Sequence, residues 1–84
     1  MYLKLKDAAK RYAMSQQFLH QVADKMGDSG CYPNSAVIKT PGATLFLDTA
    51  LHDYLMNMTA IKHGLKIAPF DPTAMQKELK EIDI

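Results

Sequence analysis

Apolar residues recur at helical spacing in two stretches near the start of the chain, and a short break separates the two. In the first stretch they recur every three or four residues, which predicts a helix over residues 6–13. Met14 interrupts this pattern. The hydroxyl of Ser15 can accept a hydrogen bond from one of the unpaired N–H groups that begin a helix. We therefore expect a second helix over residues 15–26.

This second stretch separates into an apolar and a polar face. The apolar stripe consists of Leu19, Val22, Ala23 and Met26. The polar face consists of Gln16, Gln17, His20, Gln21 and Asp24. Two short helices separated by about one turn, with hydrogen-bonding side chains early in the second, are typical of a helix-turn-helix. One face of the second helix is thus expected to pack, and the other to contact a ligand such as DNA.

The next part of the chain predicts a hairpin followed by a third helix. Two short β-prone runs within residues 36–47 surround Pro41 and Gly42, which suit the central positions of a tight turn. Asp48 is a candidate N-cap for a helix over residues 48–63. The order helix, helix, hairpin, helix is that of a small winged helix-turn-helix. The expected fold class is α+β and mostly α.

Residues 65–84 are expected to form a linker and a final helix outside the domain of residues 1–64. The linker contains two prolines, and Asp71 as N-cap before Pro72 predicts a helix over residues 72–82. The apolar stripe of this helix consists of Met75, Leu79 and Ile82. A helix this short must pack on something to persist in water. Three hypotheses remain open: it folds back on its own core, it docks on a second copy or a larger protein, or it frays in solution.

Charge is distributed unevenly along the chain, although the net charge is only +1. Up to residue 66, eight lysines and arginines face five aspartates, whereas the last 18 residues carry two lysines and four acids. A mildly basic domain and an acidic tail predict modest affinity for nucleic acid, because cations that neutralise phosphates supply most of that affinity. The cations nearest the first helix are Lys4, Lys6, Lys10 and Arg11, which form a phosphate-contacting cluster or a solvated face. Of these four, Lys10 and Arg11 are the candidate DNA-binding residues.

Composition excludes several classes of protein. A chain of 84 residues with 48% hydrophobic and 23% charged residues allows one globular core. It lacks both a signal-peptide core and an apolar run of about 18 residues, and the single cysteine, Cys31, fits a reducing compartment, so we expect a cytoplasmic protein that does not enter membranes.

Catalysis and metal binding are not expected. The sequence offers no paired nucleophile and base and no phosphate-binding glycine loop. His20 has no cysteine or carboxylate partner at metal-ligand spacing, and His52 and His63 are expected on a helix surface. We therefore expect no enzyme activity, cofactor, metal or small-molecule substrate.

The chain resembles the excisionase-like and MerR-like winged-helix DNA-binding domains over residues 3–60. The resemblance is carried by Leu5-Lys6-Asp7-Ala8-Ala9 with Tyr12, by Met14-Ser15 with Leu19, by the hairpin, and by Leu47-Asp48 leading into Leu51 through Leu55. In that family the second helix enters the major groove and the hairpin wing approaches the DNA backbone or the minor groove. By position, the resemblance implies DNA contacts from Gln16, Gln17, His20 and Gln21, and from Lys39, Thr40 and Thr44 on the wing.

Two functions from different classes follow. The first is a non-catalytic DNA-binding module like the excisionase-type accessory factors, in which glutamine can bond adenine through two hydrogen bonds. The alternative is a protein-interaction subunit that keeps the winged-helix scaffold and holds a larger nucleic-acid enzyme, such as a recombinase or a polymerase. The expected partners are DNA and, through the tail, a second copy or a larger protein. The sequence assigns no role to the loop of residues 27–34.

Overall fold

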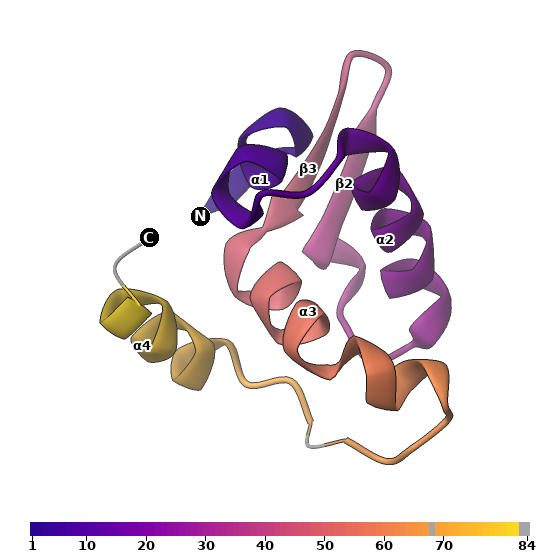
Figure 1. Cartoon of the computed structure of the whole chain (residues 1–84), viewed down its shortest axis with the longest axis vertical. Helices are drawn as coiled ribbons and strands as arrows, with labels where there is room; N and C mark the ends of the chain where they lie inside the picture. Colours follow the sequence, from indigo (N-terminus) through magenta and orange to yellow (C-terminus); the bar gives the residue numbers. More distant parts are fainter. Residues whose placement is uncertain (68, 83–84) are drawn as a thin grey trace.

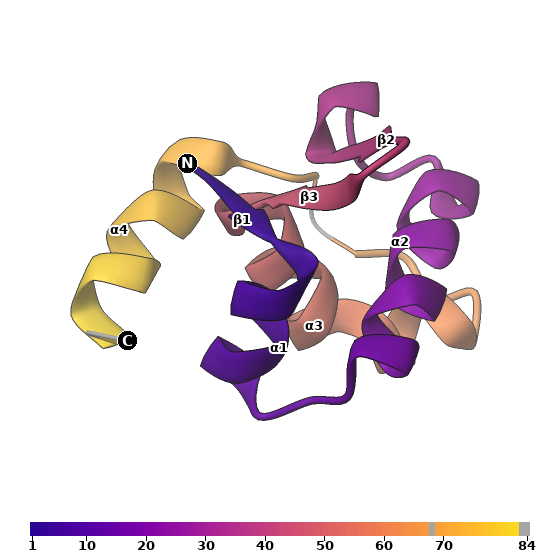
Figure 2. The same ribbon diagram turned by 90° about the horizontal axis from the view of Figure 1, so that it is seen from above.

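In the computed structural model, which describes residues 1–67 and 69–82, four α-helices pack with a three-stranded antiparallel sheet (Figure 1). The elements are β1 (Tyr2–Lys4), α1 (Leu5–Tyr12), α2 (Gln16–Ser29), a 3-10 turn (Asn34–Ala36), β2 (Val37–Thr40), β3 (Ala43–Leu47), α3 (Asp48–Lys62) and α4 (Pro72–Ile82). The sheet lies along one side of α1, α2 and α3, and α4 lies beyond α1 and α3 (Figure 2). The expected α+β class with mostly helical content is confirmed.

The sheet has the order β1-β3-β2, so β3 is its central strand. Phe46 of β3 lies opposite Leu3 on one side and Val37 on the other. The predicted hairpin is confirmed, and Thr40 closes its turn through two hydrogen bonds of 3.0 Å with the backbone of Ala43. Strand β1 is absent from the elements predicted from the sequence, because a strand of three residues exists only through its pairing with β3, more than forty residues away.

The core lies between the sheet and the first three helices. Its largest fully buried side chains are Phe46, Leu19, Met26, Leu51 and Val22. The predicted apolar stripe of α2 is confirmed, since all four of its members are buried. Because this stripe fixes the rotation of α2 about its axis, the opposite face of the helix is left in solvent.

Ser15 is the N-cap of α2, as the sequence predicts. Its hydroxyl oxygen accepts a hydrogen bond from the N–H of Phe18 at 3.1 Å. The helix continues through Ser29, three residues beyond the predicted end, and stops at Gly30, whose φ of 69° favours glycine.

We expect Ser15→Ala to lower the free energy of unfolding by about 1 kcal/mol, because an N–H group at the start of α2 loses its acceptor. Urea unfolding followed by circular dichroism measures this change. Ser35→Ala is the matched control, because the Ser35 side chain is exposed and its hydroxyl makes no hydrogen bond within the described residues. Equal stabilities of the two variants would contradict the capping role.

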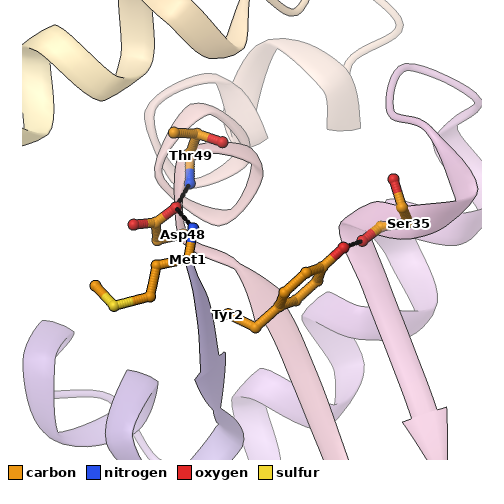
Figure 3. A network of polar contacts seen from close by, with 5 residues as sticks. All are labelled: Met1, Tyr2, Ser35, Asp48 and Thr49. Carbon is orange, nitrogen blue, oxygen red and sulfur yellow. Dashed lines mark hydrogen bonds and ion pairs between the residues drawn. The ribbon is translucent and has the colours of Figure 1, made fainter.

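The beginning of α3 differs from the predicted cap. Asp48 is the first residue of the helix, and its Oδ1 accepts from the N–H of Thr49 at 2.8 Å (Figure 3). The same oxygen lies 3.4 Å from the amino group of Met1, and the N–H of Asp48 donates to the carbonyl of Met1 at 3.0 Å. The prediction that Asp48 is the N-cap is therefore wrong: this buried carboxylate ties β1 to α3 instead.

The loop after α2 contacts two other segments of the chain, α3 and the linker that precedes α4. The Tyr32 hydroxyl donates to Oδ2 of Asp53 at 2.7 Å, and Asp53 is buried in α3. The Tyr32 ring lies edge-on to Tyr54 and to Phe70, with ring centroids 6.2 Å and 5.4 Å away. Burial, and then the Asp53 carboxylate, raise the pKa of the Tyr32 phenol far above its ordinary value. The loop thus holds α3 and the linker together, a role that the sequence did not reveal.

The tail lies against its own chain in this structure. Oδ1 of Asp71 accepts from the N–H groups of Thr73 and Ala74, which confirms the predicted cap of α4. Oε1 of Glu78 lies 3.8 Å from Nε2 of His52 in α3. Of the predicted stripe, Met75 and Leu79 are half-buried, and the side chain of Ile82 lies outside the described residues.

Candidate nucleic-acid interface

A groove of about 480 Å³ separates the tip of the hairpin from the first turns of α2. The junction of β1 and α1 forms its third side, and the hairpin projects beyond the helices next to it (Figure 1). The polar side chains that line it are Lys4, Lys6, Gln16, His20, Thr40 and Thr44. We call these six residues and the space between them the groove.

The groove is lined by positively charged side chains and, among its described lining, by no negatively charged one. Lys4 and Lys6 supply two positive charges, and no carboxylate belongs to its described lining. Neither lysine forms an ion pair with any described residue, so both ammonium groups are free to bind an anion. Two such groups beside amide, imidazole and hydroxyl groups suit a ligand that carries phosphates together with hydrogen-bonding edges.

The position of the two lysines follows from the alternation at the start of the chain. Leu3 and Leu5 are 9% and 7% exposed and belong to the core, whereas Lys4 and Lys6 are exposed. Pairing of β1 with β3 then brings this segment beside the hairpin. Both lysines belong to the basic cluster near the first helix, but the sequence predicts DNA contacts only from Lys10 and Arg11 of that cluster. The alternation of leucine and lysine was the available signal.

The structure gathers only some of the predicted DNA-contacting residues in the groove. Gln16 and His20 of α2 line it together with Thr40 and Thr44 of the hairpin. Gln17 and Gln21 are exposed on α2 but do not line the groove.

The predicted cations lie elsewhere. Lys10 is exposed on α1 and does not line the groove. Arg11 lines a different hollow of about 130 Å³, together with Leu79 of α4. Lys39 of β2 donates a hydrogen bond to Oδ1 of Asp24 on α2. These three cations are therefore outside the groove that Lys4 and Lys6 occupy.

The expectation that His52 lies on a helix surface is wrong, because His52 is buried in α3, where it makes a structural contact. Nδ1 of His52 lies 3.0 Å from the Tyr12 hydroxyl, and Nε2 has no hydrogen-bond partner among the described residues. Burial raises the pKa of the Tyr12 phenol. Within the described ranges, no three histidine, cysteine or acidic side chains are grouped so that they could hold a metal ion. None of the described helices is long and apolar enough to cross a membrane.

Comparisons of this chain with protein-family models, with characterised proteins and with solved structures found no match.

Proposed function

We propose that this protein is a non-catalytic DNA-binding module of the winged helix-turn-helix type. In this proposal α2 enters the major groove of duplex DNA, and the hairpin of β2 and β3 acts as the wing. The observation that carries the proposal is the groove, which combines two unpaired lysines with the polar side chains of α2 and the hairpin.

The geometry suits a duplex in the following way. A helix in the major groove and a wing on the same face of DNA leave one sugar-phosphate strand running between them. The groove lies between these two elements, with Lys4 and Lys6 on its third side. Cations at that position neutralise phosphates, and phosphate contacts fix the register of the protein on the duplex.

Base recognition is assigned to the exposed face of α2. Gln16, Gln17, His20 and Gln21 are all exposed there, because the opposite stripe is buried. Glutamine can bond adenine N6 and N7 simultaneously, and histidine can donate to or accept from a base edge. These side chains discriminate between bases, whereas the two lysines supply affinity that is independent of sequence.

Fluorescence anisotropy of labelled duplex and single-stranded DNA, over a range of salt concentrations, tests the proposal. We expect duplex binding that weakens with salt, with a slope of about −0.9 for each phosphate contacted. Tight binding to single strands alone would contradict a helix in the major groove. Selection from a random duplex pool then identifies the preferred site.

Gln16→Ala and His20→Ala should each reduce the preference for the selected site over a mismatched site by about 1–3 kcal/mol. The reason is that each variant loses hydrogen bonds to base edges, whereas the buried stripe of α2 is untouched. Competition anisotropy measures the preference, and thermal unfolding checks that stability is retained. Gln76→Ala, in an exposed glutamine of α4 outside the groove, is the matched control. Unchanged discrimination in both groove variants would contradict base reading by α2.

A second candidate function is a protein-interaction subunit that holds a larger nucleic-acid enzyme. An apolar hollow of about 240 Å³ favours it, lined by Tyr54, Met58 and Ile61 of α3 and by the last turns of α2. The elements that line this hollow, the end of α2 and the second half of α3, lie at the end of the molecule away from the hairpin tip (Figure 1). A folded protein that binds no duplex even at about 50 mM salt would favour this function over the first.

A further inference from the structure

An exposed carboxylate lies on the face of α2 that we propose meets DNA. Asp24 follows His20 by four residues, so the two side chains lie one turn apart on the same face of the helix. The carboxylate is 67% exposed. A negative charge at this position repels a phosphate backbone that follows the groove beyond His20. Such a charge by itself lowers DNA affinity. In this structure the charge is paired with a cation of the hairpin.

The cation is the ammonium group of Lys39 on β2. Lys39 lies opposite Thr44 in the hairpin, and Thr44 lines the groove, so Lys39 is placed at the edge of the groove. The ammonium donates a hydrogen bond to Oδ1 of Asp24 and holds the pKa of that carboxyl below its ordinary value. The Asp24 carboxylate is therefore charged at neutral pH and forms an ion pair with the Lys39 ammonium.

We propose that Asp24 keeps Lys39 from binding DNA phosphates and so lowers the part of the DNA affinity that does not depend on sequence. This inference rests on the proposed DNA-binding function. The Asp24 carboxylate repels a phosphate that approaches the Lys39 ammonium beside it. The ion pair therefore opposes the phosphate contact.

The consequence concerns the strength of binding to every sequence, and the preference between sequences is unchanged. The lysines of the groove bind any duplex equally, whereas Gln16 and His20 distinguish bases. Removing Lys39 from the set of phosphate contacts weakens binding to every sequence by a similar factor. It leaves the hydrogen bonds to bases unchanged, so base contacts supply a larger share of the total binding energy at the preferred site.

The chain supplies a matched control for this effect. Asp28 lies one turn after Asp24 on α2, is exposed, and lines the same shallow hollow as Asp24 and Lys39. It forms no ion pair with any described residue. Asp24→Asn and Asp28→Asn change the net charge equally, and only the first releases Lys39. An exposed ion pair contributes little to folding, so both variants are expected to remain folded.

The experiment measures affinity for a mixed-sequence duplex against salt concentration for the wild type, Asp24→Asn, Asp28→Asn, Lys39→Ala and the Asp24→Asn/Lys39→Ala double variant. We expect Asp24→Asn to steepen the salt slope by about 0.9 and to raise affinity about tenfold at low salt, because one phosphate contact is gained. Asp28→Asn should leave the slope unchanged. Lys39→Ala should leave the slope unchanged in the wild type and reverse the gain in Asp24→Asn.

Several results would overturn the inference. Lower affinity of folded Asp24→Asn would show that the pair positions the wing, and equal effects of Asp24→Asn and Asp28→Asn would show a general charge effect. An unchanged slope in Asp24→Asn would show that Lys39 gains no phosphate.

The ion pair itself is tested without DNA. A carbon-13 NMR titration should show the pKa of Asp24 below its ordinary value, returning toward that value in Lys39→Ala. A pKa that does not respond to this substitution would overturn the inference whether or not DNA binds. Absence of duplex binding by every variant, with the pair intact, would instead refute the proposed function and with it the role of Asp24.

Discussion

Replacing Lys4 and Lys6 together by alanine should lower affinity for duplex DNA about a hundredfold at low salt and flatten the salt slope by about 1.8. Both ammonium groups line the groove, and neither pairs with a carboxylate among the described residues. Each is therefore expected to neutralise one phosphate of the strand that passes between α2 and the hairpin. Anisotropy titrations at several salt concentrations measure both quantities.

The control for this prediction is charge-matched. Lys10→Ala/Lys25→Ala removes two exposed lysines that do not line the groove, so the net charge falls equally. We expect a smaller loss of affinity and a nearly unchanged slope from this control. Equal losses in the two double variants would mean that DNA responds only to overall charge, and the groove would then have no special role.

Tyr32→Ala should lower the free energy of unfolding by about 3–5 kcal/mol, which is the usual cost of removing a packed aromatic side chain. The ring contacts Tyr54 and Phe70, and its hydroxyl satisfies the buried carboxylate of Asp53. Tyr32→Phe keeps the ring and should cost about 1.5–3 kcal/mol, because a hydrogen bond to a charged group is lost. Urea unfolding separates the two contributions.

Tyr2→Phe is the control for the hydroxyl. Its hydrogen bond to the carbonyl of Ser35 has the same length of 2.7 Å but is exposed (Figure 3). Water can replace an exposed partner, so we expect a cost well below that of Tyr32→Phe. If both variants lose the same stability, the burial of Asp53 is not what makes the Tyr32 contact strong.

The sequence by itself determined the elements whose signals are local. Ser15 and Asp71 accept hydrogen bonds from N–H groups only two or three residues away, so the starts of α2 and α4 could be predicted. The hairpin turn likewise depends on neighbouring residues. The buried stripe of α2 followed from helical periodicity, and this stripe also identified Gln16 and His20 as exposed polar residues. Local hydrogen bonds and periodicity require no knowledge of the rest of the fold.

The tertiary structure alone decided the contacts between residues distant in the chain. Strand β1 exists through pairing with β3, and that pairing brings Lys4 and Lys6 to the groove instead of Lys10 and Arg11. The separation between Tyr32 and Asp53 is 21 residues, and between Lys39 and Asp24 it is 15.

The residues next to these partners in the sequence contain no pattern that predicts either contact. The partners meet only because burial of the apolar stripe fixes how α2 faces the sheet, and because the pairing of β3 fixes where the hairpin and α3 lie. Many chain arrangements satisfy the same local pattern, and the packing of one shared core selects among them.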